Sequence, residues 1–110
     1  MSDYNSIMHE VDIMESALKQ LTVRGNTFAT AERDYKMALS KQILLFKAEG
    51  KPATLILNLC YGTQEIANLR MARDIAEVML KSAHEAINVK KIKIKVMSNE
   101  YDKVWNNTNG

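Results

Sequence analysis

Apolar residues recur along the first half of the chain at spacings of three and four, the period of one face of an α-helix. The series is Ile7, Val11, Met14, Leu18, Leu21, Gly25, Phe28, Glu32, Tyr35, Leu39, Gln42 and Phe46. The segment "TVRGNT" around Gly25 contains residues that often end or cap helices. The spacing nevertheless continues in register from Leu21 to Phe28, so we predict one amphipathic helix over residues 6–49. A break at Gly25 is the alternative.

A turn separates this helix from the second half of the chain. Gly50 is a residue type that often ends helices, and Pro52 cannot continue a helix but can open one. The segment after Pro52 is apolar most of the way round, which predicts a short buried helix over residues 52–60. Thr63 is a suitable N-cap for a third helix over residues 63–104. The polar tail at residues 106–110 is expected to fray.

The third predicted helix carries a second apolar series with the same spacing. Its members are Ile66, Leu69, Arg73, Ala76, Leu80, Ala83, Ile87, Lys90, Ile94, Met97, Tyr101 and Val104. Within it, the segment "KIKIKV" at residues 91–96 alternates with a period of two, which is typical of a half-buried strand. We favour a helix there, because Ile87, Ile94 and Tyr101 keep the helical register around it. Leu80 and Ile87 are expected in the core.

Two long amphipathic helices joined by a short connector predict an all-α fold. The expected architecture is an antiparallel long-helix hairpin, similar to a coiled coil, with a short helix at the turn. Residues 1–110 would form this single domain. A two-helix hairpin buries only one seam and exposes much surface for its mass, and further apolar residues flank both stripes. We therefore expect a homo-oligomer, with a two-fold dimer favoured.

The composition agrees with a helical protein that does not enter a membrane. Only 6% of the 110 residues are aromatic and one is Pro, which is low for a β-sandwich or barrel. The first residues lack a basic stretch followed by an apolar run, and no apolar stretch is long enough to span a bilayer. The single cysteine, Cys60, cannot form an intramolecular disulfide and fits a reducing compartment. We expect a cytoplasmic protein.

Residues that could carry chemistry are few and scattered. His9 and His84 are the only histidines, and a ligand set such as His9, Glu10 and Asp12 lacks the i,i+4 spacing that places two metal ligands on one helix face. Cys60 has no neighbouring base and lies in an apolar segment, which fits a small buried side chain better than a nucleophile. Carboxylate neighbours such as Glu10 and Asp12 are ordinary on a solvated helix face. We therefore predict no enzymatic activity, and no catalytic, metal-binding or cofactor-binding residue.

Arg73 is a charged residue at a position of the apolar series. An arginine there is expected to pair with Glu32 or another acid across the hairpin, and such a polar seam would fix the register of the two helices. The alternative is a polar pocket for a ligand.

A run of lysines is the one charge feature that indicates an interaction. It consists of Lys90, Lys91, Lys93 and Lys95. These side chains could contact nucleic-acid phosphates, although the segment lacks the interleaved aromatic residues of a single-strand-binding platform. A solvated helix face is the simpler interpretation. The net charge of +2 does not by itself predict nucleic-acid binding.

Three sequence features carry a resemblance to a known group of proteins. They are an "AE-x-x-Y" helix end at Ala31, Glu32 and Tyr35, an "AEG-x-PAT" turn from Ala48 to Thr54, and an "LR-x-x-RD-x-AE" helix at Leu69, Arg70, Arg73, Asp74, Ala76 and Glu77. In these features residues 28–95 resemble small early-region proteins of Firmicutes phages and prophages, encoded near single-strand-annealing recombinase genes. The segment "LCYG" is less polar than in that group. The resemblance implies an accessory protein in the host cytoplasm, and it carries over no catalytic residue.

The sequence thus favours a non-enzymatic phage accessory protein that binds a host or phage protein, in DNA replication or recombination. A second hypothesis is a nucleic-acid-binding accessory protein that uses the segment from Lys90 to Lys95. A third is a small-molecule-binding or catalytic helical oligomer with a site between subunits.

Overall fold

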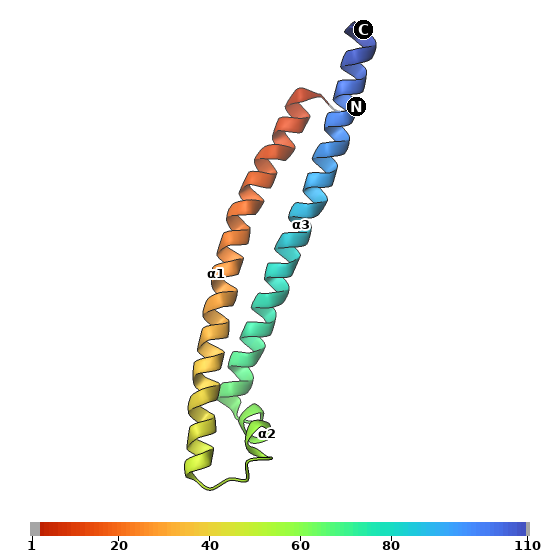
Figure 1. The fold of residues 1–110 in the computed structure, drawn as a ribbon. Coiled ribbons are helices and arrows are strands. Elements are labelled where there is room, and N and C mark those ends of the chain that lie inside the picture. The colour runs from red at the N-terminus through yellow and green to blue at the C-terminus, as the bar shows by residue number, and fades with distance from the viewer. Residues whose placement is uncertain (1–2, 110) are drawn as a thin grey trace. The chain divides into compact units, whose positions relative to one another are not determined.

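A computed structural model describes residues 3–109, and within that range the chain forms three helices and no strand (Figure 1). The helices are α1 (Tyr4–Ala48), α2 (Ile56–Tyr61) and α3 (Gln64–Asn109). The predicted all-α hairpin, with two long helices joined through a short one, is confirmed. The chain divides into two compact units. Unit 1 contains Met1–Val23 and Lys81–Gly110, and unit 2 contains Arg24–Leu80.

α1 begins two residues earlier than the sequence indicated, because Asp3 caps it. The Ser6 N–H donates a hydrogen bond of 2.7 Å to Oδ1 of Asp3, which satisfies one of the backbone donors that the start of a helix leaves unpaired. That hydrogen bond favours the carboxylate form and lowers the pKa of Asp3. α1 then runs through Gly25 without a break, as predicted. In unit 2 a side chain at position 25 would meet Leu80 Cδ1 at 4.0 Å.

α1 ends in a hydrogen-bond pattern that depends on Gly50. The φ angle of Gly50 is +77°, a left-handed conformation that glycine adopts without steric strain. Its N–H donates to the carbonyl of Lys47, and the N–H of Lys51 donates to the carbonyl of Phe46, both over 3.0 Å. These two bonds form a Schellman motif, which satisfies the last carbonyls of the helix and turns the chain away from its axis.

α2 is shorter than the helix predicted over residues 52–60, because Pro52 opens a turn instead of a helix. The N–H of Leu55 donates to the carbonyl of Pro52 over 3.0 Å, the bond of a tight turn, and α2 starts at Ile56. Thr63 stands directly before α3, at the predicted N-cap position. Its hydroxyl, however, donates to the carbonyl of Leu59 over 3.0 Å, so Thr63 ties the end of α2 to the start of α3.

α3 is helical through residues 91–96, so the strand interpretation of "KIKIKV" is wrong. The helix also continues to Asn109, beyond the end expected near residue 104. Neither Pro nor Gly occurs between Gly62 and Gly110, so nothing in this stretch strongly opposes the helix. Residues 106–109, which were expected to fray, therefore belong to α3, and Gly110 lies outside the described residues.

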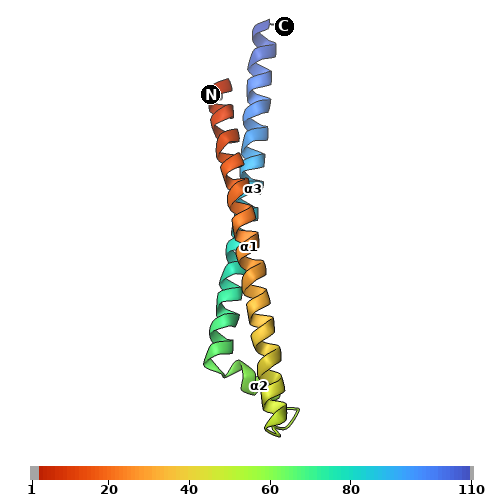
Figure 2. The ribbon, with the colours of Figure 1, turned by 90° about the vertical axis from the view of Figure 1, so that its left-hand side faces the viewer.

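Most of the buried apolar residues lie in unit 2. They are Tyr35, Ile56, Cys60, Ile66 and Ala76. Two of these five belong to α2, which places that short helix against the long helices of its unit near the turn (Figure 2). Ile87 is buried in unit 1, as predicted, whereas Leu80 of unit 2 is only half-buried.

Two residues that the sequence placed on the apolar stripes, Leu18 and Val104, are exposed instead. A straight helix has about 3.6 residues per turn, and a repeat of seven residues corresponds to 3.5, so the stripe drifts around the helix. Near Leu18 the half-buried positions are those of Ala17 and Leu21. The period identified the helices correctly but misplaced individual side chains on their faces.

Candidate interaction surfaces

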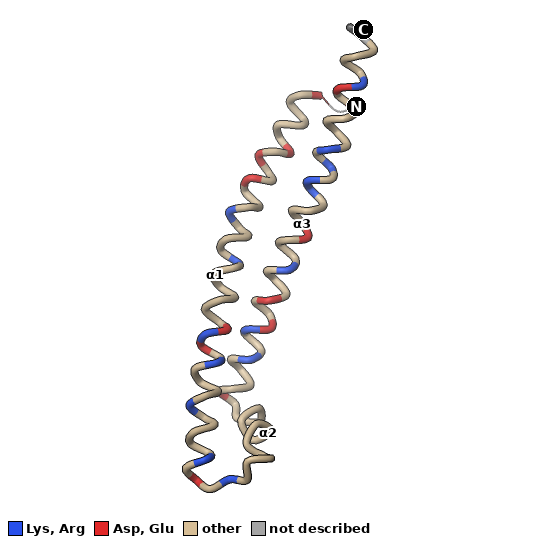
Figure 3. The backbone as a smooth tube through the Cα atoms, viewed as in Figure 1, with Lys and Arg blue, Asp and Glu red and all other residues tan. Residues whose placement is uncertain are grey.

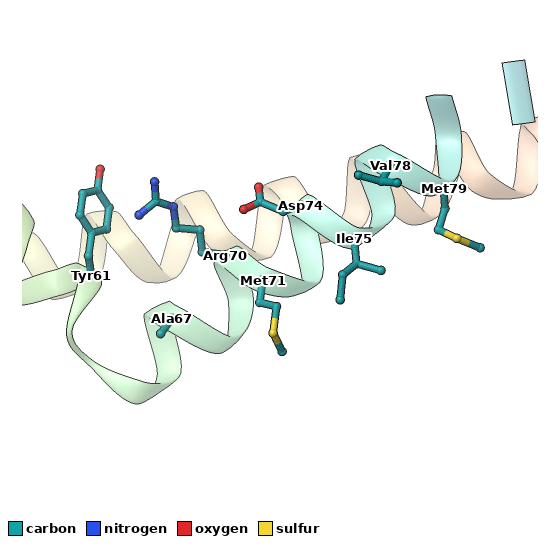
Figure 4. Close-up of a pocket in the computed structure, with 8 residues that line it drawn as sticks. All are labelled: Tyr61, Ala67, Arg70, Met71, Asp74, Ile75, Val78 and Met79. Atoms are coloured by element: carbon teal, nitrogen blue, oxygen red, sulfur yellow. The ribbon is translucent and has the colours of Figure 1, made fainter. Parts of the chain in front are cut away.

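Unit 2 carries an open, mainly apolar groove of about 500 Å³ beside the end of α2 and along α3 (Figure 4). Its lining residues are Tyr61, Ala67, Arg70, Met71, Asp74, Ile75, Val78 and Met79. Met71, Ile75 and Val78 follow the spacing of four and three that places residues on one helix face. Figure 4 shows Met71, Ile75 and Met79 extending from the same side of α3. We call this surface the unit 2 groove.

The charged residues at the rim of the unit 2 groove are held by partners within unit 2. The guanidinium of Arg70 lies 4.4 Å from the centre of the Tyr61 ring, a cation–π contact. Asp74 accepts hydrogen bonds from Nε and Nη2 of Arg73 at 3.0 and 2.8 Å. The lining between these two charged residues and beyond them along α3 is apolar, with Met71, Ile75, Val78 and Met79.

Arg73 makes contacts that differ from those expected of a polar seam. Its ion pair is with Asp74 on its own helix, whereas Glu32 pairs with Lys36 at 3.4 Å. The hydrogen bonds to Asp74 raise the pKa of Arg73. Towards α1, the guanidinium lies 4.6 Å from the centre of the buried Tyr35 ring. The contact between the two long helices of unit 2 at this level is therefore cation–aromatic.

The lysine segment of α3, part of the basic stretch that Figure 3 shows in blue, has two roles in unit 1. Nζ of Lys90 donates to Oε2 of Glu10 over 2.6 Å, and Nζ of Lys93 lies 2.9 Å from Oε1 of the same carboxylate. Lys91 and Lys95 are exposed, and neither forms a hydrogen bond or an ion pair with the described residues. Of the four lysines that could contact phosphates, Lys90 and Lys93 therefore join α3 to α1 within unit 1.

Glu10 is the acid of this cluster, and the interpretation of its carboxylate as an ordinary group on a solvated helix face is wrong. Its side chain is 12% exposed, and the hydrogen bonds from Lys90 and then Lys93 lower its pKa to about 2. Counting outward from the turn does not find this cluster. Equal numbers of residues counted from Ala48 along α1 and from Gln64 along α3 place Glu10 opposite Asp102 and not opposite the lysines.

The ion pairs of Glu10 with Lys90 and Lys93 should make the free energy of unfolding depend on pH. Because the pKa of Glu10 is about 2 when folded and near its ordinary value of 4.5 when unfolded, its ion pairs contribute fully above pH 4.5. That contribution is lost as the pH falls towards 2. In Glu10→Gln, the free energy of unfolding, measured by urea denaturation followed by circular dichroism, should fall less steeply across that window.

The matched control for this measurement is Glu15→Gln, which removes a carboxylate from an exposed position of the same helix. We expect this variant to keep the wild-type slope. Equal flattening in both variants would show that the slope follows total charge and not the pairing of Glu10.

α3 also carries an exposed apolar face in unit 1. Val89, Ile92 and Val96 are spaced by three and four, and all three are exposed, Ile92 to 65%. Lys91 and Lys95 are four residues apart and therefore share one side of the helix beside this face. We call these five residues the unit 1 face. It combines exposed apolar side chains with two ammonium groups that the fold does not use.

Within residues 3–109, no group of three or more His, Cys, Asp or Glu side chains is placed to hold a metal ion. None of the helices in this range has a segment long and apolar enough to cross a membrane. Comparison of the chain with protein-family models, curated proteins and solved structures gives no significant match. The unit 2 groove and the unit 1 face are therefore the candidate interaction surfaces of the described residues.

Proposed function

We propose that this chain is a non-enzymatic accessory protein that acts by binding another protein through the unit 1 face. The observation that carries the proposal is the exposure of Val89, Ile92 and Val96 in helical spacing. Isolated exposed apolar residues are common on soluble proteins, but a row along one helix resembles the anchors of a helix-in-groove complex. A partner that covers this row would remove its apolar area from water.

The two lysines of the unit 1 face indicate the chemistry of the proposed partner. Lys91 and Lys95 are exposed and unpaired among the described residues, whereas Lys90 and Lys93 are engaged by Glu10. A complementary surface would carry apolar residues in its centre and carboxylates along one edge. An amphipathic helix with an acidic flank has this pattern, and the charge pairing would favour its encounter with α3 and fix its orientation.

The sequence resemblance supports a biological setting for this proposal. Residues 28–95 resemble early-region accessory proteins of Firmicutes phages, and the genes of those proteins lie near recombination genes. We therefore place the protein in the host cytoplasm, with a host or phage protein of DNA replication or recombination as its partner.

Nucleic-acid binding is the second candidate, and the exposure of Lys91 and Lys95 is the observation in its favour. Two side chains supply few phosphate contacts, and the affinity of such complexes grows with the number of phosphates neutralised. The apolar centre of the unit 1 face also has no role in contacting phosphates. Lack of binding to single-stranded and duplex DNA at low salt, measured by fluorescence anisotropy, would exclude this candidate, since screening is weakest there.

Site-specific photo-crosslinking in a Firmicutes host tests the proposal. A benzophenone amino acid at Ile92 should give a covalent adduct with one discrete protein. The same group at Ile13, an exposed isoleucine of α1 in the same unit, is the matched control and should not give that adduct. Reversing the charges with Lys91→Glu and Lys95→Glu should reduce the yield at least about tenfold if the partner is acidic.

The crosslinking results test the interaction and the acidity of the partner separately. Identical adducts from Ile92 and Ile13, or no adduct from Ile92, would contradict the proposed interaction. An adduct whose yield is insensitive to the two charge reversals would retain the interaction but reject an acidic partner.

A further inference from the structure

The two units differ in how many apolar side chains they bury. Among the described residues of unit 1, Ile87 alone is buried, whereas unit 2 buries the five residues Tyr35, Ile56, Cys60, Ile66 and Ala76. The stability gained from burial grows with the apolar area removed from water, and a segment with few buried contacts opens at a lower free energy than the rest of a protein. Unit 1 is therefore the unit expected to open first.

The other apolar residues of unit 1 are covered only in part. Val11 and Met14 of α1 and Ile94 of α3 are half-buried, and Ile13 and Leu18 of α1 are 40% and 42% exposed. Apolar burial at this level gives each of the two segments of unit 1 a modest stabilisation, so polar contacts between them carry more weight than they would in a well-packed core.

The Glu10 ion pairs are such a contact, because they join the α1 segment of unit 1 to its α3 segment. Oε2 of Glu10 lies 2.6 Å from Nζ of Lys90, and Oε1 lies 2.9 Å from Nζ of Lys93. Both oxygens of one carboxylate are thus used, and both partners are on α3. The Glu10 side chain is 12% exposed and that of Lys90 is 24% exposed. Loss of the carboxylate would leave the partly covered Lys90 ammonium without its acid, which favours exposure of the lysine to water.

We infer that the Glu10 ion pairs hold unit 1 closed, and that its α1 and α3 segments separate together when those pairs break while unit 2 stays folded. Separation exposes Ile87 and releases Lys90 and Lys93. The α1 segment that carries Glu10 thus controls access to one side of α3.

This control gives Glu10 an autoinhibitory role towards an acidic partner, a consequence that rests on the proposed function. In the closed form Lys91 and Lys95 are exposed, and Glu10 occupies Lys90 and Lys93. In the open form all four ammonium groups are available to carboxylates of the partner. A partner that binds the open form more tightly than the closed form shifts the population towards the open form.

Native-state hydrogen exchange of the purified chain, read by mass spectrometry, tests the opening without any variant. Amides in residues 8–22 and 83–96, from unit 1, should exchange at least about tenfold faster than amides in residues 30–46 and 66–79, from unit 2. The two unit 1 segments should share one level of protection, because they separate together. Equal protection of the two units would overturn the inference. So would protection in unit 1 that rises steadily from the helix ends without a common level, since that pattern is fraying.

Glu10→Gln tests the role of the ion pairs. Exchange should accelerate at least about fivefold in residues 8–22 and also in residues 83–96 of the other helix, with residues 30–46 and 66–79 unchanged. Glu15→Gln, which removes an exposed carboxylate from the same segment of α1, is the matched control and should change neither unit. Equal acceleration in both units, or none in residues 83–96, would overturn the role of Glu10.

The opening and the proposed function fail in different ways, because hydrogen exchange is measured without a partner. A cellular adduct from Ile92 together with equal protection of the units would retain the proposed function and overturn the opening. A common opening of unit 1 without that adduct would retain the opening and reject the proposed function. Where both hold, Glu10→Gln should increase the yield of the Ile92 adduct, and an unchanged yield would overturn the autoinhibitory role.

Discussion

Replacing Tyr35 by Ala should lower the free energy of unfolding by about 3–5 kcal/mol, the range for truncation of a buried aromatic side chain. Tyr35 is 5% exposed, and its ring packs under the Arg73 guanidinium at 4.6 Å. The substitution therefore creates a cavity and removes the cation–π contact between α1 and α3. Chemical denaturation of both proteins at the same protein concentration measures the loss.

Tyr35→Phe is the matched control, because it keeps the ring and removes only the hydroxyl. Its effect should be about 1 kcal/mol or less, the net contribution of one hydrogen bond. If Tyr35→Phe destabilised the protein as much as Tyr35→Ala does, the hydroxyl and not the ring would hold this part of unit 2. If Tyr35→Ala had no effect, the described contact between α1 and α3 would be wrong.

Ile66→Ala should lower the free energy of unfolding by about 2–5 kcal/mol, the range for truncating a buried isoleucine. Ile66 is 1% exposed in the first turns of α3. The fully buried Cys60 and the buried Ile56 of α2 belong to the same unit. Few other buried side chains are available to close the cavity, so the upper part of that range is expected.

Ile92→Ala provides the comparison for Ile66→Ala, since it is the same substitution on the same helix at a residue that is 65% exposed. A change within about 0.5 kcal/mol is expected there, as for other surface substitutions. Losses of similar size at both positions would mean that Ile92 is covered in solution. That result would indicate that the unit 1 face is already covered in the purified protein.

The helices were predictable because each long helix carries an apolar period that local sequence does not contradict. Continuity through Gly25 followed from the uninterrupted register, and the helical state of residues 91–96 followed from flanking residues such as Ile87 and Tyr101. The limits of α2 were less predictable. Pro52 is compatible with both a turn and the first turn of a helix, and local sequence does not decide between them.

The contacts between helices were predicted less well than the helices themselves. Arg73 was correctly marked as unusual, but its ion pair is with Asp74, its ring contact is with Tyr35, and Glu32 acts on it only through a weaker electrostatic attraction. The choice depends on side-chain rotation and on the offset of the two helices, and neither can be read from a repeat. Glu10 shows the same limitation, because its role depends on lysines that lie 80 residues away in the sequence.

The sequence indicated that surplus apolar residues should form another interface, but it did not place that interface. Met71, Ile75 and Val78 have the same spacing as the buried series, and only their position relative to α1 and α2 shows that they are exposed. The exposed face of α3 could therefore be recognised as a candidate interaction surface only after the structure showed which face of the helix is buried.

The complete burial of Cys60, the single thiol of the chain, gives the protein a built-in kinetic probe. A thiolate must be reached by solvent before it reacts with a maleimide or disulfide reagent, so modification of Cys60 requires at least local opening of unit 2. When reclosing is faster than the reaction, the labelling rate divided by that of a free thiol gives the fraction of molecules open at any moment. Because Cys60 belongs to the natural sequence, no cysteine has to be engineered, and that fraction can be compared between the free protein and its partner complex.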